Sequence, residues 1–247
     1  MKIALVTGAG RVGALGFETA RQLGGLGFHV VLTARKVGQA EERARELQAE
    51  GLTVTPLHLD ITDEESVRRA VAFVRERFGK LDVLINNAAI LMESPESDFK
   101  TDLTSAGNQF NTNLFGTWRM AQEFHPLLKA AGSARIVNVS SGSGSFWDCG
   151  FGLVNNPGFE MAQFGDVSIA AYQLSKLAIN GLTLKLAQDY RNDNILVNAI
   201  CPGLVSTRPG APGRSPEEGA RSIVWGATLP DHGPTGMFFR DGKQLPW

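Results

Sequence analysis

Tyr172 and Lys176 have the side chains and the spacing of a proton-transfer pair. In a helix, residues four positions apart lie on the same face, so a phenol hydroxyl and an ammonium group can reach one ligand. The pKa of a free tyrosine is about 10, and an opposite charge within a few ångström lowers a pKa by roughly 1–3 units. The pair is therefore suited to general acid or base catalysis near neutral pH.

A glycine-rich segment near the start of the chain has the composition of a phosphate-binding turn. The sequence GAGRVGALG at residues 8–16 follows the apolar run at residues 3–6, and Gly8, Gly10 and Gly13 fit the pattern G-x-G-x-x-G. Such a turn between a strand and a helix binds anions through backbone N–H groups and the helix dipole. The segment predicts dinucleotide binding. The alternative is a turn that only packs tightly.

The end of the second predicted strand indicates which dinucleotide is bound. Arg35 and Lys36 stand where an acidic residue would bind the ribose hydroxyl of NAD, and Arg11 adds a third cation in the glycine loop. Arginine binds the additional phosphate of NADP well, so NADP(H) is the expected cofactor. For Lys36, a solvated surface charge is an equally good interpretation.

The elements that must position these residues alternate along the chain. Apolar runs predict seven strands, at residues 3–7, 29–34, 53–59, 83–86, 135–140, 195–200 and 236–239. Amphipathic segments predict helices at residues 14–25, 37–50, 63–78, 98–130 and 169–191, the fourth long enough to contain a break, and Ser215-Pro216 begins another helix with a capping box. The alternation predicts one α/β domain over residues 1–247, in which a seven-stranded parallel sheet is doubly wound with helices on both faces.

Composition excludes several classes of protein. The chain has 247 residues and a formal net charge of −1, so neither nucleic acid nor an anionic membrane is an expected partner. No apolar run approaches the roughly 20 residues needed to cross a bilayer, and no signal for secretion is seen. Cys149 and Cys201 lack metal-ligand spacing, and the four histidines are scattered, so no metal site is expected. We expect a cytoplasmic protein with free, buried thiols.

Several motifs in one order resemble the short-chain dehydrogenase/reductase family over nearly the whole chain. They are TGAGRVGALG (7–16), LDI (59–61), NNAA (86–89), NTNLFGT (111–117), IVNVSS (136–141), YQLSK (172–176) and CPGLVST (201–207). Within that family, the final FFRDGKQLPW, the TAR after the second strand and the lengthened segment before Tyr172 are similar to the carbonyl reductases. The resemblance implies a Rossmann fold.

The resemblance also implies a catalytic set. Tyr172 would exchange a proton with the substrate oxygen, and Ser141, rather than Ser140, would orient that oxygen. Lys176 would hold the nicotinamide ribose and lower the pKa of Tyr172. Asn113 would hold a water that links Lys176 to solvent, although an ordinary helical asparagine is the alternative.

Further positions are implied for cofactor binding. Asp60 would lie near the adenine, Asn87 would brace the central strand, and the backbone of Pro202 to Val205 with Thr207 would border the nicotinamide. The full implied set is Gly8, Gly10, Arg11, Gly13, Gly16, Arg35, Asp60, Ile61, Asn87, Ala88, Tyr172, Lys176, Pro202, Gly203, Val205 and Thr207.

Two departures from the family pattern concern the cofactor cleft. The interval from Gly8 to Gly16 is two residues longer than T-G-x-x-x-G-x-G allows. Either the loop bulges, with Gly8, Gly10 and Gly16 making the close approaches, or Gly13 takes a cradle position. Ala89 stands where the family has glycine, and its methyl either narrows the cleft or is absorbed by a backbone shift.

The segment at residues 142–168 is expected to be an insertion over the edge of the sheet. Its aromatic residues either wall an apolar substrate pocket or fill the insertion; they are Phe146, Trp147, Phe151, Phe159 and Phe164.

The sequence therefore predicts an NADPH-dependent reductase of ketones or aldehydes, acting on a small-molecule carbonyl or alcohol substrate as a monomer or a dimer. The alternatives are NAD-dependent oxidation of a secondary alcohol and a non-catalytic protein that senses a nucleotide.

Overall fold

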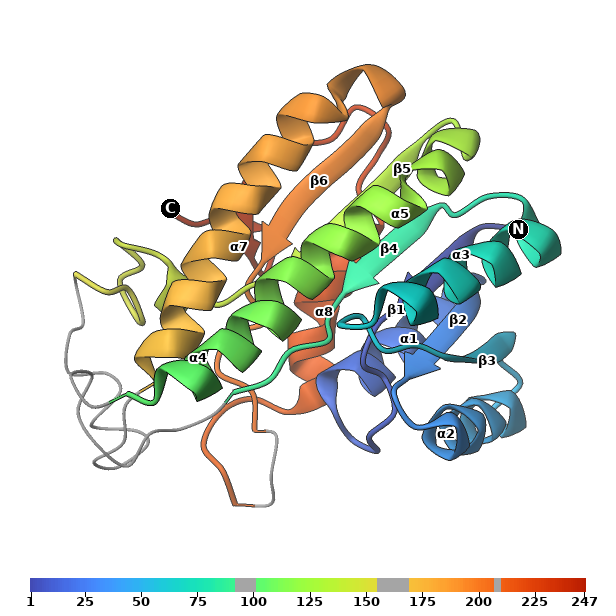
Figure 1. Cartoon of the computed structure of the whole chain (residues 1–247), viewed down its shortest axis with the longest axis horizontal. Coiled ribbons are helices and arrows are strands. Elements are labelled where there is room, and N and C mark those ends of the chain that lie inside the picture. The colour runs from blue at the N-terminus through green and yellow to red at the C-terminus, as the bar shows by residue number, and fades with distance from the viewer. Residues whose placement is uncertain (92–100, 155–168, 207–209) are drawn as a thin grey trace.

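The computed structural model describes residues 1–91, 101–154, 169–206 and 210–247. In these ranges one sheet has the strand order β3-β2-β1-β4-β5-β6-β7-β8 (Figure 1). The strands are β1 (Ile3–Val6), β2 (His29–Ala34), β3 (Val54–His58), β4 (Val83–Asn86), β5 (Ala134–Val139), β6 (Ile195–Ile200), β7 (Phe238–Arg240) and β8 (Lys243–Gln244). Strands β1 to β7 pair in parallel, as predicted.

The prediction of seven strands was wrong by one, because it missed β8, which pairs with β7 in the antiparallel direction. The turn between them is Asp241-Gly242, with φ values of 50° and 73°. Two central residues with positive φ make the tight hairpin turn for which Asp-Gly is a strong sequence signal. The predicted strand edges otherwise lie within two residues of the observed ones, which is ordinary for element boundaries.

The helices also follow the predicted periodicity. They are α1 (Leu15–Gly25), α2 (Val37–Ala49), α3 (Glu64–Phe78), α4 (Leu103–Phe110), α5 (Thr117–Ala130), α7 (Ala170–Asp189) and α8 (Pro216–Ala227), with short 3₁₀ turns η3 (Gly142–Gly144) and η4 (Arg191–Asp193). Between α4 and α5 lies a π-helical turn, η2 (Asn111–Gly116), where the sequence indicated a possible break. Such turns widen a helix locally and are frequent at functional sites.

Side-chain caps explain where two helices begin. Asp63 caps α3 by accepting from the backbone N–H of Glu65. Ser215 and Glu218 form the predicted capping box at α8. Each cap satisfies N–H groups that have no partner inside the helix.

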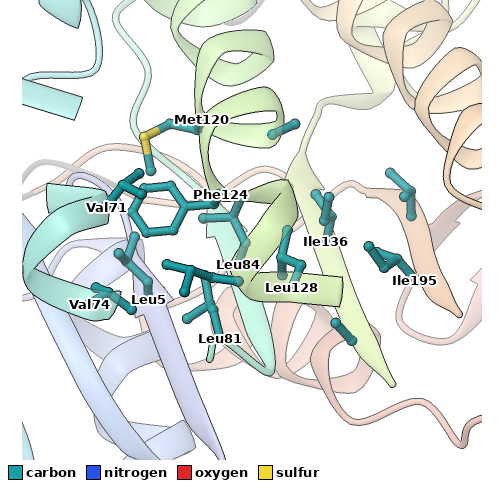
Figure 2. Close-up of a cluster of buried hydrophobic side chains, with 14 of the residues drawn as sticks. Leu5, Val71, Val74, Leu81, Leu84, Met120, Phe124, Leu128, Ile136 and Ile195 are labelled. Carbon is teal, nitrogen blue, oxygen red and sulfur yellow. The ribbon is translucent and has the colours of Figure 1, made fainter. Parts of the chain in front are cut away.

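Two hydrophobic clusters fix the helices on the two faces of the sheet. Helices α3, α5 and α7 cover one face and helices α1, α2 and α8 cover the other (Figure 1). On the first face, Phe124 and Met120 of α5 pack among Leu5, Leu84 and other aliphatic side chains (Figure 2). Because both faces are covered, the central strands read as continuous apolar runs rather than alternating ones.

The two cysteines differ in environment. Cys201 is buried, as predicted, whereas Cys149 is exposed, so the expectation of two buried thiols was wrong for Cys149. Cys149 lies in the turn that follows the buried residue Asp148, and its side chain is directed away from the core. At the C-terminus, Trp247 stacks on Phe238 of β7, with ring centroids 5.7 Å apart.

Thr7 links the ends of β1 and β4, the strands that carry the glycine loop and the NNAA motif. Its buried hydroxyl donates to the carbonyl of Ile85 and accepts from the backbone N–H groups of Asn87 and Ala88, both at 2.9 Å. The amide of Asn87 returns a hydrogen bond of 2.8 Å to the Thr7 carbonyl. One hydroxyl therefore sets the distance between these two loops.

Replacing that hydroxyl tests its contribution to stability. We expect Thr7→Val to lower the free energy of unfolding by about 1–3 kcal/mol, because two backbone N–H groups lose their acceptor. Thr7→Ser keeps the hydroxyl and is the matched control, with a smaller loss. Urea denaturation measures both, and equal stability of the two variants would contradict the assignment.

Candidate active site

Four loops meet at the carboxyl edge of the sheet. They follow β1, β4, β5 and β6, and in the strand order β1 and β4 are neighbours from which the chain proceeds outward in opposite directions. In an open parallel sheet, the crevice at this switch point is where ligands bind. Most of the residues singled out from the sequence lie here.

The glycines of the loop differ in their surroundings, while the choice between the two predicted arrangements around a cofactor stays a prediction. A Cβ atom at Gly8 would lie 2.8 Å from the Cα of Ala88, and one at Gly10 would lie 2.6 Å from the Cβ of Ala34. A Cβ at Gly16 would collide with the side-chain amide of Asn87. Gly13 has no such neighbour, but its φ of 59° requires the left-handed conformation that glycine favours. Gly13 therefore shapes the turn, while the other three glycines make the close approaches.

A cleft of about 640 Å³ lies over this loop. Nine of the predicted cofactor residues line it: Gly8, Gly10, Arg11, Gly16, Arg35, Asp60, Ile61, Asn87 and Ala88. Gly13 is exposed and stands outside this set. Thr207 lies outside the described residues.

The basic end of the cleft contains one residue that the sequence analysis missed. Arg35 and Lys36 are exposed and line the cleft together with Gln39 from the first turn of α2. Gln39 is three residues after Lys36, so its position in the first turn of a predicted helix was the available signal. Asp60, predicted to lie near the adenine, also lines the cleft, and its carboxylate accepts hydrogen bonds from the backbone and the hydroxyl of Thr62, at 2.9 and 2.6 Å.

A second cavity, of about 380 Å³, continues from the cleft. The two share Arg11, Leu15, Asn87, Ala89 and Ile90 as lining residues. The second cavity also contains the predicted residues Ser141, Tyr172, Lys176, Pro202, Gly203 and Val205. A long ligand in the cleft can therefore extend one end into the cavity that contains the proton-transfer pair.

Ser141 and Tyr172 both line this cavity. The hydroxyl of Ser141 lies 2.9 Å from the hydroxyl of Ser143. The hydroxyl of Ser140 is used elsewhere, because it donates to the side chain of Asn180 at 2.6 Å. The choice of Ser141 rather than Ser140 as the orienting residue stays a prediction. Ser143 was missed, although a third serine two positions on was visible in the sequence.

Burial governs the protonation of the pair in this structure. Burial raises the pKa of Tyr172 above its ordinary value, the nearby Cys201 adds to the increase, and the hydrogen bond with Ser141 opposes it. Burial also lowers the pKa of Lys176 to about 8. The ammonium group of Lys176 lies 5.4 Å from the centre of the Tyr172 ring and donates to the carbonyl of Val139 at 2.7 Å. The sequence predicted a lowered pKa for Tyr172, whereas in this structure burial raises it.

Close backbone contact positions helix α7, which carries Tyr172 and Lys176. A Cβ at Gly144 in η3 would lie 2.6 Å from the backbone of Lys176. Next to this contact, the side-chain amide of Asn180 donates to the carbonyl of Gly144 at 3.0 Å. The absent side chain at Gly144 therefore lets the turn after Ser141 lie directly against α7.

Asn113 joins three segments of the site from the π-helical turn. Its amide nitrogen donates to the carbonyl of Ile90 and to the hydroxyl of Ser175, both at 3.0 Å, and its oxygen accepts from the N–H of Ile90 at 2.9 Å. Ser175 in turn donates to the carbonyl of Tyr172 at 2.7 Å. The buried side chain thus connects the segment after β4 with α7, and the water-holding role remains a prediction.

The aromatic residues of the insertion divide into two groups. Phe151 lines the second cavity, whereas Phe146 and Trp147 are 45% and 56% exposed. Phe159 and Phe164 lie outside the described residues.

Within residues 1–91, 101–154, 169–206 and 210–247, no helix is long and apolar enough to cross a bilayer. The same residues contain no group of three or more histidine, cysteine or acidic side chains placed to hold a metal ion.

Comparisons with known proteins agree with the motifs. A family model described as short chain dehydrogenase matches residues 2–150 and 157–217. Carbonyl reductase (NADPH) 1 of Sus scrofa is 35% identical, covering 100% of this chain and 94% of the relative. Short-chain dehydrogenase anuI of Penicillium roqueforti (strain FM164) is 38% identical, covering 92% and 88%. The solved structure of NADPH-bound carbonyl reductase from chicken fatty liver has a TM-score of 0.82 at 27% identity, covering 100% of both chains.

The predicted resemblance to the carbonyl reductases is confirmed by relatives that match over nearly the full length of both chains. The family model spans most of the sequence. The chain therefore belongs to the short-chain dehydrogenase family.

Proposed function

We propose that this protein reduces a ketone or an aldehyde to an alcohol with NADPH. The observation that carries the proposal is that Ser141 and Tyr172 line one cavity, which continues from the glycine-loop cleft. Two hydroxyl groups in one cavity can both bind the oxygen of a carbonyl group. The relatives named carbonyl reductase (NADPH) support the same reaction.

The cleft fits NADP(H) on structural grounds. Gly8, Gly10 and Gly16 lie tightly against neighbouring segments and also line the cleft, so the loop presents its backbone there to a pyrophosphate. Arg35 and Lys36 supply positive charge at the end where a ribose phosphate would lie. When bound, the nicotinamide supplies the hydride.

The protein's own residues then manage the substrate oxygen. The hydroxyl of Ser141 donates a hydrogen bond to that oxygen and orients it, and the phenol of Tyr172 gives it a proton. The raised pKa keeps Tyr172 protonated and therefore able to donate at neutral pH. The charge of Lys176 beside the ring stabilises the phenolate that remains after the transfer. Asn113 acts as a positioning residue through its contact with Ser175.

Removal of the phenol hydroxyl tests the proton donor. We expect Tyr172→Phe to lower kcat for carbonyl reduction about 10²–10⁴-fold, the usual contribution of general acid catalysis. The assay is loss of NADPH absorbance with a panel of ketones and aldehydes. The matched control is Tyr190→Phe, because the hydroxyl of Tyr190, the other tyrosine in the chain, is bonded to the carbonyl of Ala121 in the helix layer. Equal activity of Tyr172→Phe and the wild type would refute the assignment.

The lowered pKa of Lys176 predicts the pH dependence of the free enzyme. Below pH 8, Lys176 is protonated and its charge is present; as the pH rises through about 8, the proton and the charge are lost. We therefore expect kcat/KM for NADPH to fall above pH 8. Lys176→Arg, whose guanidinium stays charged in this range, should move the fall to higher pH. A profile that is flat between pH 7 and 9 contradicts this role.

Arg35 is expected to select the phosphorylated cofactor. Arg35→Ala should raise the Kd for NADPH about 10- to 100-fold, the range for loss of a hydrogen bond to a charged group, and should leave the Kd for NADH nearly unchanged. Fluorescence titration with each cofactor measures this difference. Arg68→Ala, an exposed arginine on α3, controls for loss of surface charge. A similar change for both cofactors would indicate that Arg35 does not contact the phosphate.

A further inference from the structure

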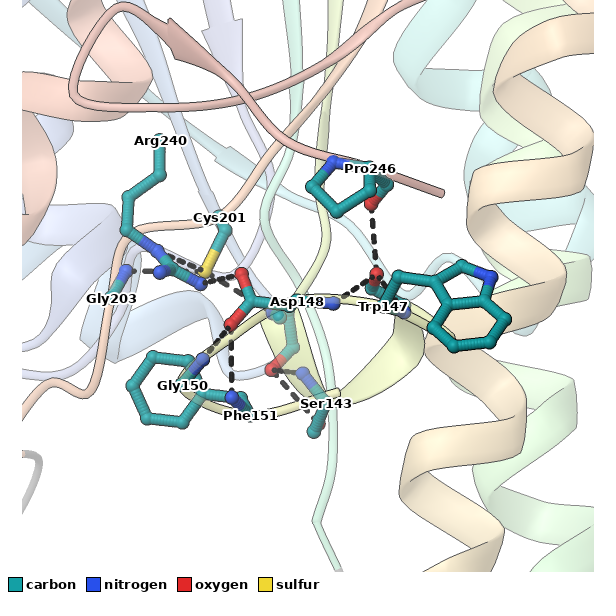
Figure 3. Close-up of polar contacts among 12 residues, drawn as sticks. Ser143, Trp147, Asp148, Gly150, Phe151, Cys201, Gly203, Arg240 and Pro246 are labelled. Atoms are coloured by element: carbon teal, nitrogen blue, oxygen red, sulfur yellow. Dashed lines mark hydrogen bonds and ion pairs between the residues drawn. The ribbon is translucent and has the colours of Figure 1, made fainter. Parts of the chain in front are cut away.

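A buried ion pair fastens the first part of the insertion to strand β7. The guanidinium of Arg240 lies 2.7 Å from one carboxylate oxygen of Asp148, whose side chain is fully buried (Figure 3). The other oxygen of Asp148 accepts from the backbone N–H groups of Gly150 and Phe151, both at 2.9 Å. Both oxygens are thus used, and they define the turn that leads to Phe151.

Arg240 also holds the ring of Phe151 directly. Its guanidinium carbon lies 4.8 Å from the centre of that ring, within the range of a cation–π contact. Its Nε atom donates to the sulfur of Cys201 at 3.4 Å, which ties the guanidinium to the end of β6. The ring is therefore fixed by the backbone on one side and by a buried cation on the other.

This cluster lies directly behind the catalytic serine. A Cβ at Gly142, the residue after Ser141, would collide with the guanidinium of Arg240 and would lie 2.9 Å from the ring of Phe151. Only glycine leaves space for both groups at that point. The position of Phe151 is consequently set relative to Ser141 rather than to the surface of the insertion.

Phe151 faces the cavity in which the carbonyl is proposed to bind. It lines that cavity together with Ser141 and Tyr172, and other apolar walls come from Leu91, Ile169 and Leu204. The neighbouring aromatic side chains of Phe146 and Trp147 are exposed instead. Flat aromatic rings prefer to pack against other rings in offset or edge-to-face geometry.

A buried ion pair contributes little net stability compared with apolar residues of the same size, so stability does not account well for this one. The buried charge of Asp148 and its many hydrogen-bond partners are better explained if they fix one conformation of the loop. The cost of burying Asp148 and Arg240 is then offset by a fixed orientation of Phe151.

We propose that Phe151 is the specificity-determining wall of the substrate site, held by Asp148 and Arg240 as positioning residues, and that it favours carbonyl compounds with an aromatic group beside the carbonyl. This inference rests on the proposed carbonyl reduction. Phe151 would contact the substrate directly, whereas Asp148 and Arg240 would not.

The first experiment compares two ketones, acetophenone and 2-butanone. We expect Phe151→Ala to raise KM for acetophenone about 10- to 30-fold, since the packing of one ring against another is lost. KM for 2-butanone and the Kd for NADPH should change little. Trp147→Ala, an exposed aromatic in the same segment, is the matched control and should leave the ratio of the two KM values unchanged. An unchanged ratio in Phe151→Ala would overturn the inference.

The second experiment tests whether Arg240 acts through Phe151. Arg240→Met should shift the ratio of the two KM values in the same direction as Phe151→Ala does. Arg240→Lys keeps the charge beside Asp148 and should bring the ratio part of the way back to the wild-type value. The double variant Arg240→Met with Phe151→Ala should show the ratio of Phe151→Ala alone, because residues in one interaction are not additive. A purely structural role would lower kcat for both ketones and leave the ratio unchanged. That outcome, or additive effects in the double variant, would overturn the positioning role.

Binding without turnover separates this inference from the proposed function. Calorimetric titration of the NADPH-bound protein with acetophenone should give a Kd that rises in Phe151→Ala, whether or not the ketone is reduced. If binding weakens but neither ketone is turned over, the inference is supported and carbonyl reduction fails. If both are reduced and the two proteins bind acetophenone equally, the inference fails and the proposed function stands.

Discussion

The catalytic geometry depends on how closely helix α7 lies against the turn after β5. Gly144 allows backbone contact with Lys176, and the Asn180 side chain bridges the same two segments. Ser141 precedes this turn and Tyr172 lies one helical turn before Lys176, so the contact places both side chains at the same cavity. Closely packed interiors transmit small displacements, and a shift of about an ångström can cost a large factor in rate. The two hydroxyl groups proposed to act on the substrate oxygen are thus placed by backbone packing rather than by flexible side chains.

Burial shifts the pKa values of Tyr172 and Lys176 in opposite directions. Removing the phenol from water raises the pKa of Tyr172 and keeps the phenol protonated, while removing the ammonium group from water lowers the pKa of Lys176. The sequence argument considered only the attraction between the two groups, which lowers the pKa of a tyrosine. Desolvation is decided by everything packed around the pair, including Cys201 and Val139, and therefore could not be estimated from the spacing of two residues.

The parts that sequence predicted well are those governed by local patterns. Buried parallel strands are continuous apolar runs, and the loop with Gly8, Gly10 and Gly16 combines glycines with a strand before it and a helix after it. The tight turn at Asp241-Gly242 has an equally local signal, so β8 was predictable and was overlooked. The sequence did not predict which glycines of this loop lie against neighbouring segments. That depends on the residues that approach the loop from other segments, among them Ala34 and Ala88.

This contrast explains why the cofactor side was more predictable than the substrate side. The cofactor cleft is built from backbone turns, so glycines and the residues that end strands identify it in a sequence. The substrate wall proposed at Phe151 is held by Asp148 and by Arg240, which is 92 positions from Asp148. Sequence patterning could suggest several aromatic residues for that wall, but only the partners of each ring distinguish Phe151 from the exposed Trp147. With the proposed roles, the cleft over the glycine loop can remain constant while changes in the insertion and at the C-terminus alter which carbonyl compound is accepted.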